Sequence, residues 1–304
     1  MEFFCLCMSP ALDASVTLPA WPSDGVIFKD VAETENVGGK GINVARWLAL
    51  RGAKVACGGL LGADNAAPFE QELARCGIGD AFVRVPGATR RNEMIVTPGG
   101  SFKLNRPAFP GLPADFDALA VLECPRSRGT RDPTASRVAI LSGSLPPAVP
   151  KDFYAAATRA LKACGWTVVL DASGEALRLG VEAGPDLIKP NADECEALIG
   201  FVPKTPDDFR RATEALRAHA AHVIISDGGA GAWFDGEFVA APEVKVLDTT
   251  SAGDTLLAEY CWRAFADATD AARWAVAAGS AAVTMPGSMP PPVELVEKLK
   301  ENIK

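Results

Sequence analysis

The sequence has little histidine and no surplus of positive charge. Its only histidines, His219 and His222, stand at the end of a helical stretch that leads into a strand. That position predicts surface or capping roles and argues against histidine catalysis or a histidine metal site. The 304 residues hold 30 Lys and Arg against 38 Asp and Glu, which gives a net charge of −8. Since a nucleic-acid-binding protein presents a basic face, nucleic acid is not an expected partner.

The sequence also lacks the patterns of a disulfide-rich protein and of a membrane protein. Its eight cysteines include no C-x-x-C pair, so we expect reduced thiols in a protein core. The apolar segment 3–8, FFCLCM, is too short to span a membrane and follows Glu2 with no basic region before it. It therefore predicts a first buried strand. Together these features predict a cytoplasmic protein with no membrane partner.

Short aliphatic runs alternate with amphipathic segments along most of the chain. This alternation predicts one large α/β domain whose mostly parallel sheet is covered by helices on both faces. Ligands of such sheets collect beyond the carboxyl ends of the strands, where Ser142, Asp171, Lys189 and Ser226 stand. The predicted strands are 54–59, 137–141, 167–171, 186–188 and 223–226, and the predicted helices include 65–76, 152–163, 193–199 and 206–218.

Two regions, 12–36 and 87–107, break this alternation with period-two patterning and turn residues. They predict a small β-sheet that lies over the site as a lid and excludes the water that competes with an acceptor hydroxyl. The resulting boundaries are an α/β domain of residues 1–10, 38–86 and 108–304, and a lid of residues 11–37 and 87–107. The segment 124–136 predicts a surface loop or, alternatively, a source of substrate contacts.

The segment 248–255, DTTSAGDT, precedes an apolar helical run and carries the clearest chemistry. Free N–H groups in the first turn of a helix form an anion site, aided by the helix dipole. The carboxylate of Asp254 would stand at the rim of that site, where it could take a proton from an attacking hydroxyl. Phosphoryl transfer to an alcohol needs such an anion site beside a base. Taken alone, the segment also fits an ordinary N-capped helix after a turn of small residues.

A second segment, 37–46 (VGGKGINVAR), places three glycines and a lysine at the start of another helix. Glycine lets a ligand approach the backbone closely, and Asn43 falls in the first turn, where its amide can face that ligand. The spacing is not that of a P-loop, because Gly41 follows Lys40 where a P-loop has Ser or Thr. No G-x-G-x-x-G stands at a strand-to-helix turn with a suitably placed acid, which argues against a nicotinamide-binding Rossmann fold.

Together, these two segments resemble the signatures of the ribokinase-like sugar kinases, in particular the phosphofructokinase B branch. Further segments resemble elements of that branch: 8–13 (MSPALD), 142–146 (SGSLP), 189–194 (KPNADE) and 226–231 (SDGGAG). The resemblance runs over nearly the full length and implies a ribokinase-like three-layer α/β/α sandwich with a small β-sheet lid. It implies ATP and Mg²⁺ as cofactors, a small-molecule sugar phosphate as partner, and a homodimer formed through the lid. It also implies that the Ala-rich helix 271–284 and the turn after it wall the adenine pocket.

The resemblance implies roles for individual residues. Backbone amides around Ala252 and Gly253 would stabilise the transferred phosphoryl group while Asp254 acts as base. The family usually has glycine where this chain has Ser251, so a left-handed backbone at that position would be strained. The sugar would contact Asp13, Gly38, Gly39, Lys40, Asn43 and Ser142. The nucleotide would contact Lys189, Asn191, Ser226, Gly228 and Gly231, and Glu194 would hold Mg²⁺ through water.

Some of these assignments have simpler alternatives. An ion pair or a helix cap would explain Asp13 equally well from its residue type alone. Asn191 and Glu194 also fit a helix cap and its capping box, and both roles can hold together.

Specificity depends on cations near the predicted lid. Arg90 stands in a Thr-Arg-x-Asn context that this family branch uses to contact the substrate phosphate, and Lys103, Arg106 and Lys29 lie on lid segments. Each could be a solvated surface charge, but their gathering in a protein of net charge −8 favours a phosphate pocket.

The sequence therefore predicts a Mg·ATP-dependent kinase that converts a ketohexose phosphate of the fructose 1-phosphate or tagatose 6-phosphate class to a bisphosphate. Fructose 6-phosphate is the next candidate substrate. One alternative is a kinase of an unphosphorylated sugar or nucleoside. Another, suggested by Ser251, is a catalytically weak sugar-phosphate-binding protein.

Overall fold

The first strand, β1 (Glu2–Cys7), lies inside the main sheet, where its apolar run is buried on both faces. The computed structural model describes residues 1–25, 27–29, 31–109, 112–113, 116–123, 125, 136–265 and 270–303. Within these residues, the strand order is β13-β12-β11-β10-β9-β8-β1-β4-β5. The strands from β11 to β5 run parallel, and β12 and β13 add an antiparallel edge. The other strands are β4 (Lys54–Gly62), β5 (Gly79–Val85), β8 (Arg137–Ser142), β9 (Thr167–Asp171), β10 (Leu187–Ile188), β11 (His222–Ser226), β12 (Gly231–Phe234) and β13 (Glu237–Ala240).

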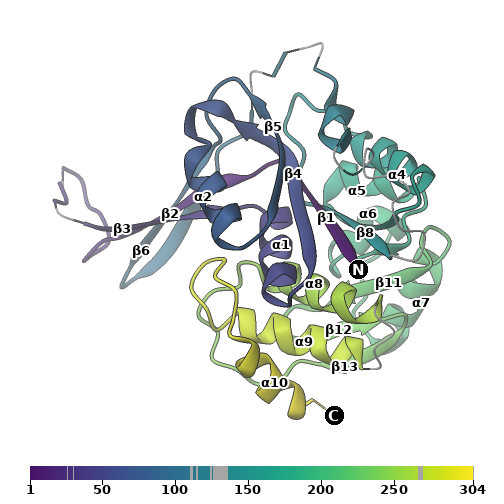
Figure 1. Ribbon diagram of the computed structural model, residues 1–304. Helices are drawn as coiled ribbons and strands as arrows, with labels where there is room; N and C mark the ends of the chain where they lie inside the picture. Colours follow the sequence, from purple (N-terminus) through teal and green to yellow (C-terminus); the bar gives the residue numbers. More distant parts are fainter. Residues whose placement is uncertain are drawn as a thin grey trace.

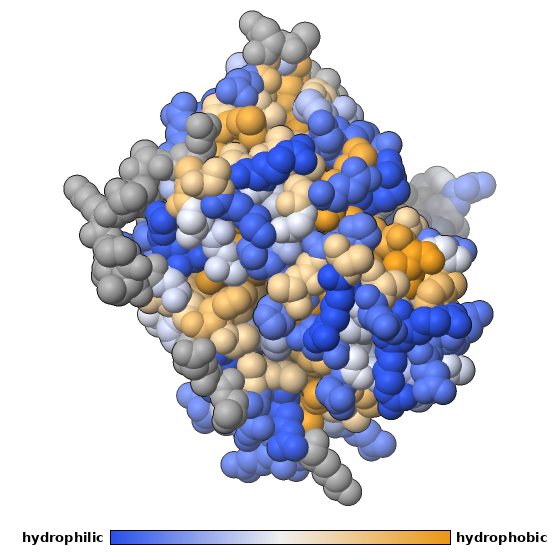
Figure 2. Space-filling model, turned by 90° about the vertical axis from the view of Figure 1, so that its right-hand side faces the viewer, coloured by the Kyte–Doolittle hydropathy of each residue, from blue (hydrophilic) through white to orange (hydrophobic). Residues whose placement is uncertain are grey.

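Helices cover both faces of this sheet (Figure 1). Because side chains alternate along a strand, Phe3 and Cys5 of β1 join one hydrophobic cluster while Phe4 and Leu6 join the other. The first cluster is covered by α1 (Lys40–Leu50), α2 (Ala67–Arg75), α8 (Ala252–Ala264), α9 (Ala271–Ala282) and α10 (Val293–Glu301). The second is covered by α4 (Phe153–Ala163), α5 (Gly174–Val181), α6 (Glu194–Ile199) and α7 (Pro206–Leu216). The outer face that carries α4, α5 and α7 mixes polar residues with smaller apolar areas (Figure 2). The predicted three-layer α/β/α class is confirmed.

A second, small sheet has the order β3-β2-β6-β7 and projects from the main body (Figure 1). Its strands are β2 (Ala11–Thr17), β3 (Ala32–Gly38), β6 (Arg91–Thr97) and β7 (Gly100–Leu104). β2 follows β1 after only a short turn, and β3 leads directly into α1. One end of the small sheet is therefore fixed at the carboxyl end of β1. The division of the chain into a core and a lid at the stated boundaries stays a prediction.

The sequence patterns did not indicate β5, β12 or β13. β5 is an edge strand whose Asp80 and Arg84 pair with each other, so its polar positions hide the strand pattern. β12 and β13 are four residues each and turn at Asp235 and Gly236, both with positive φ, so each is too short for a clear period. The predicted loop 124–136 lies outside the described residues except at 125 and 136.

Two expectations about the chain as a whole concern cysteines and membranes. The seven cysteines within the described residues are free thiols, and five of them are buried. No helix in the described part of the chain combines the length and apolar character that crossing a membrane requires.

Candidate active site

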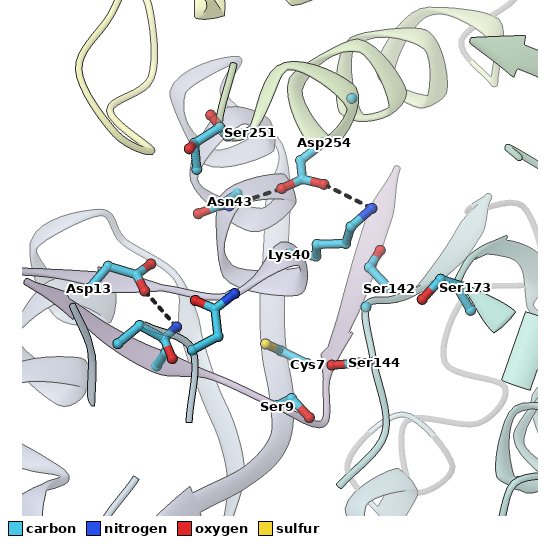
Figure 3. A pocket seen from close by; sticks show the side chains of 18 of the residues that line it. Cys7, Ser9, Asp13, Lys40, Asn43, Ser142, Ser144, Ser173, Ser251 and Asp254 are labelled. Atoms are coloured by element: carbon cyan, nitrogen blue, oxygen red, sulfur yellow. Dashed lines mark hydrogen bonds and ion pairs between the residues drawn. The ribbon is translucent and has the colours of Figure 1, made fainter. Parts of the chain in front are cut away.

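A cavity of about 500 Å³ opens where the carboxyl ends of β1 and β8 meet the first turns of α1 and α8 (Figure 3). This is the edge of the sheet at which ligands of α/β proteins bind. The cavity therefore gathers segments from widely separated parts of the sequence. The sequence-predicted residues that line it are Asp13, Gly39, Lys40, Asn43, Arg90, Ser142, Ser251, Ala252, Gly253 and Asp254.

The start of α8 provides an anion site at one side of this cavity. Thr255 donates its N–H to the carbonyl of Ser251 over 2.9 Å, so the N–H groups of Gly253 and Asp254 precede the first intrahelical bond. Free N–H groups at the positive end of a helix dipole favour an anion. The first turn of α8 can therefore receive a phosphoryl group beside Asp254.

Ser251, the residue before α8, adopts a left-handed backbone conformation with φ of 63°. For a residue with a Cβ this conformation costs roughly 1–2 kcal/mol. The Oγ of Ser251 is buried without a hydrogen-bond partner among the described residues, so the hydroxyl does not offset that strain. The position therefore has the geometry for which glycine is suited, as the resemblance implied.

Asp254 is 4% exposed and is held from α1. Its Oδ2 accepts a hydrogen bond from Asn43 Nδ2 over 2.9 Å, and its Oδ1 lies 3.7 Å from Lys40 Nζ (Figure 3). Burial raises the pKa of Asp254 above its ordinary value, although the charge of Lys40 and the Asn43 hydrogen bond act in the opposite direction. A carboxylate with a raised pKa is a stronger proton acceptor, which suits a general base.

Asp171, at the end of β9, connects two lysines below the cavity. Its Oδ2 lies 3.0 Å from Lys40 Nζ and its Oδ1 lies 3.1 Å from Lys189 Nζ. Burial alone would raise the pKa of Asp171, but the two ammonium groups outweigh it and lower this pKa. Asp171 therefore stays ionised and fixes both lysines. The sequence placed this residue at a strand end but gave it no role.

The small sheet contributes polar groups to the opposite side of the cavity. Asp13 Oδ1 accepts a hydrogen bond from Asn92 Nδ2 over 2.9 Å, which joins β2 to β6. Burial raises the pKa of Asp13. A Cβ at Gly38 would collide with the Oδ2 of Asp13, so this glycine leaves the space that the carboxylate occupies. Gly38 thus acts through Asp13 and does not itself line the cavity.

The predicted phosphate-binding cations differ in where they lie. Arg90 lines the cavity, and its guanidinium donates to the carbonyls of Ser9, Pro10 and Arg106. Lys103 Nζ donates to Thr250 Oγ1 over 3.0 Å, which connects β7 to the segment before α8. Arg106 pairs with Glu93 and has a side chain 59% exposed, and Lys29 is also exposed. The side chains of Lys103, Arg106 and Lys29 do not line the cavity, so their roles stay predictions.

A second cavity of about 660 Å³ shares Thr249, Ala252 and Gly253 with the first. The predicted nucleotide residues Asn191, Ser226, Gly228 and Gly231 line it, together with an apolar wall of Val244, Val246, Leu256, Val276 and Val283. The predicted Ala-rich helix is α9, which contributes to that wall. The start of α8 therefore separates a polar cavity from a more apolar one. Such a pair of cavities can hold two reactants whose reacting groups meet at the start of α8, next to Asp254.

The sequence pattern of the pfkB family of carbohydrate kinases matches residues 22–294. The chain is 35% identical over 305 aligned residues to a 1-phosphofructokinase of Rhodobacter capsulatus, covering 97% of this chain and 95% of the relative. The chain belongs to the pfkB family of carbohydrate kinases.

Solved structures agree with this assignment. Phosphofructokinase-2 from Escherichia coli in complex with potassium superposes on this kinase with a TM-score of 0.88 and 27% identity, covering 99% of this chain and 98% of that one. Arabidopsis thaliana ribokinase complexed with ribose and ATP superposes with a TM-score of 0.76 at 22% identity, covering 99% and 98%. The second likeness shows the fold alone, which is the ribokinase-like fold that the sequence predicts.

In this kinase, Asn191 and Glu194 form the reciprocal contacts of a capping box. Asn191 N–H donates to Glu194 Oε2 over 2.9 Å, and Glu194 N–H donates to Asn191 Oδ1 over 2.7 Å. The simpler alternative for these residues is therefore present in the structure. The carboxylate of Glu194 also helps to raise the pKa of Lys40, after the larger influences of Asp171 and Asp254 and against the effect of burial. Its charge thus acts on a residue of the polar cavity, and its contact with Mg²⁺ stays a prediction.

Lys189 and two asparagines complete the comparison with the sequence-predicted site. Lys189 is 4% exposed, and a Cβ built on Gly253 would lie 3.4 Å from its Nζ, so it sits beneath the anion site. Asn92 and Asn105 line the polar cavity but were not assigned. Asn92 is part of the Thr-Arg-x-Asn motif, which was a usable signal. Nothing in the residue pattern singled out Asn105.

Proposed function

We propose that this kinase transfers the γ-phosphoryl group of ATP to a hydroxyl of a ketohexose phosphate of the fructose 1-phosphate or tagatose 6-phosphate class. The observation that carries the proposal is the position of Asp254 at the start of α8, where the two cavities meet. The relative from R. capsulatus, which is similar over nearly the whole chain, is a 1-phosphofructokinase, and this favours fructose 1-phosphate.

The more apolar cavity is the proposed nucleotide site. Its valines offer a surface for the adenine ring, while Ser226 and Gly228 stand near the phosphate end. A Cβ on Gly231 would collide with the carbonyl of Val239, so glycine keeps the turn beside this cavity tight. The γ-phosphate would then point toward the N–H groups of Gly253 and Asp254.

Mg²⁺ would lie near the phosphates with Glu194 in contact through water. Glu194 offers the carboxylate that this ion prefers, and its charge already acts on Lys40, which lines the polar cavity. When bound, Mg²⁺ would neutralise part of the charge on the β- and γ-phosphates.

The proposed reaction begins with the substrate hydroxyl facing Asp254. The hydroxyl oxygen forms a bond to the γ-phosphorus while the bond from that phosphorus to the bridging oxygen of ADP breaks, and Asp254 accepts the hydroxyl proton. The N–H groups of α8 and the ammonium of Lys40 stabilise charge on the transferred oxygens. Arg90 and Lys103 would bind the phosphate already on the sugar.

A substrate panel tests this function. Release of ADP is measured with fructose 1-phosphate, tagatose 6-phosphate, fructose 6-phosphate and free fructose. We expect the highest kcat/KM for one of the first two. An equal or higher kcat/KM for free fructose would favour the unphosphorylated-sugar kinase, and sugar-phosphate binding without ADP release would favour the weak binding protein.

We also propose that two copies pair through their small sheets. Trp21 and Phe102 pack together with ring centroids 5.7 Å apart, yet Trp21 is 57% exposed, and Leu104, two residues after Phe102 on β7, is exposed as well. Exposed aromatic and aliphatic side chains on one sheet are typical of an interface. Light scattering after size-exclusion chromatography should give the mass of a dimer, and Phe102→Asp should give a monomer. A monomeric wild type would contradict this pairing.

A further inference from the structure

Helices α1 and α8, which carry Asn43 and Asp254, have a second buried polar contact away from the cavity. Trp47 of α1, one turn beyond Asn43, donates its Nε1–H to Glu259 Oε2 of α8 over 2.8 Å. Both side chains are 0% exposed, and neither lines the cavity. The two helices are thus joined by Asn43–Asp254 at the site and by Trp47–Glu259 inside the core.

The carboxylate of Glu259 is surrounded by partners from both helices. Arg51 at the end of α1 lies 3.3 Å from its Oε2, and Arg263 of α8 donates to its Oε1 over 2.6 Å. Arg263 is held in turn over the ring of Trp274 in α9, 3.5 Å from the ring centroid. A buried carboxylate is stable only when its partners stay in place, so these contacts restrict how α8 can slide or rotate against α1.

We propose that Trp47 and Glu259 are positioning residues that hold α8 where Asp254 reaches both Asn43 and the substrate hydroxyl. This role rests on the proposed function of Asp254 as base. The Trp47–Glu259 contact can affect Asp254 from a distance because a helix moves as a unit. A misplacement of 1 Å at a reacting group costs about 10²-fold in rate. The apolar packing of α1 against α8 holds the two helices together, and the Trp47–Glu259 hydrogen bond fixes the position of one helix along the other.

The Asn43 hydrogen bond makes the positioning measurable. Asp254 faces Asn43 and Lys40 from α1, Asp171 from the end of β9 and Lys189 after β10. Asn43 and the two lysines lower the pKa of Asp254, whereas burial and the charge of Asp171 raise it. If α8 shifts and the Asn43 hydrogen bond loosens, a contribution that lowers the pKa of Asp254 is lost, and we expect this pKa to rise. The acid limb of the kcat profile, which is the fall in kcat at low pH, then moves to higher pH.

The test compares Trp47→Phe with Trp262→Phe. Both substitutions remove the same atoms, but Trp262 is a partly buried residue of α8 that packs against Phe3, whereas the indole N–H that Glu259 accepts is that of Trp47. We expect Trp47→Phe to lower kcat with fructose 1-phosphate about tenfold to 100-fold, with smaller changes in both KM values, and to move the acid limb upward. Trp262→Phe should keep the wild-type limb. Matching profiles for the two variants would overturn the proposal.

A double-mutant cycle separates positioning from loss of stability. If Trp47 acts through the Asn43–Asp254 contact, Trp47→Phe should add little to the loss already caused by Asn43→Ala. Independent, multiplying losses would contradict the proposal.

A second pair of variants covers the case in which Trp47→Phe does not fold. Glu259→Gln keeps an oxygen that accepts from Trp47, whereas Glu259→Met has a similar length and no such oxygen. The proposal expects Gln to preserve the acid limb and Met to move it upward. The same limb in both variants would overturn it.

The proposal and the proposed function can fail separately. The titration of the Asp254 carboxyl carbon can be followed by NMR without substrate, with the resonance assigned by its absence in Asp254→Asn. Trp47→Phe should move this titration upward and Trp262→Phe should not, whatever the substrate. If wild type releases no ADP with any sugar but this shift is present, the function fails and the positioning stands. If wild type turns over normally but Trp47→Phe does not shift the titration, the proposed function stands and the positioning role fails.

Discussion

The two walls of the polar cavity are built in different ways. The helical wall, formed by α1 and α8, holds Asp254, which is 4% exposed and is contacted by Asn43 and Lys40 of α1. Asp171, at the end of β9, is 1% exposed and is contacted by Lys40 and Lys189. The wall from the small sheet includes Asp13 of β2 and Asn92 of β6, with Arg90 and Asn105 next to them. The sheet continues to β7, which is exposed along its whole length, and the cations Arg90 and Lys103 contact carbonyls or a single hydroxyl. Segments with few buried contacts open at low free energy, whereas buried ones do not. Under the proposed function, the helical wall would be the fixed wall that holds the reaction centre, and the wall from the small sheet would be the recognition wall that moves to admit the sugar.

The largest effect is expected when Asp254, the proposed base in the fixed wall, is replaced. Asp254→Asn keeps the shape of the side chain but removes both its charge and its ability to accept a proton, so kcat should fall by about 10²–10⁴. ATP binding measured by calorimetry should be unchanged. A variant that retains roughly a tenth of wild-type turnover would contradict the assignment of Asp254 as base.

The next prediction concerns the recognition wall. Arg90→Ala should reduce kcat/KM for phosphorylated ketohexoses, because the desolvated phosphate of the substrate loses its guanidinium partner. The expected loss of transition-state stabilisation is about 2–5 kcal/mol. Free fructose should be affected much less.

The neighbouring Arg91 provides a matched control for Arg90. Arg91 pairs with Glu33, Glu35 and Glu93 on the outside of the same sheet, so Arg91→Ala should leave kcat/KM close to wild type. Equal losses for free and phosphorylated sugars in Arg90→Ala would argue against the phosphosugar assignment. They would indicate that Arg90 serves mainly to tie Ser9, Pro10 and Arg106 together.

A third prediction uses pH to examine how Lys40 changes the pKa of Asp254 in the fixed wall. Burial raises the pKa of Asp254, so the acid limb of kcat should lie above the value of about 3.9 expected for an ordinary Asp. The base must be ionised, so activity falls as pH falls through this pKa. Lys40→Met removes a cation that lowers the pKa of Asp254, and the limb should move to higher pH. A limb that stays in place or moves down would show that Lys40 does not tune Asp254.

The smallest effect is expected at Ser251. Because its φ is 63° and its hydroxyl has no partner, Ser251→Gly should relieve strain while keeping every N–H of the anion site. Allowing for the greater freedom of glycine in the unfolded chain, the gain in unfolding free energy should be about 0.5–1 kcal/mol, with kcat equal or higher. Chemical denaturation and the ADP assay measure both. A large loss of kcat would mean that the hydroxyl contacts phosphate or metal.

The sequence predicted the parts of the site that follow from local pattern. The anion site at α8 and the strand ends Ser142 and Asp171 could be placed because glycine, capping residues and apolar periods are local features. The partnership of Asp171 with Lys40 and Lys189 could not, because these residues are brought together by the order of parallel strands. Asp254 and Asn43 lie 211 positions apart and meet only through helix packing. The sequence could not distinguish Arg106 and Lys29, which are exposed, from Arg90, which lines the cavity. Their exposure depends on how the small sheet is oriented against the main sheet.

The central position of β1 has a consequence for synthesis of the chain. β1 precedes both of its neighbours in the chain, so its two edges are covered only when β4 and β8 have been made, through residue 142. At ordinary elongation rates this interval is on the order of ten seconds, during which Phe3, Phe4 and Leu6 have no sheet to enter. A nascent chain of this kind is exposed to aggregation, so its yield should depend on chaperone supply and translation speed more than its final stability suggests.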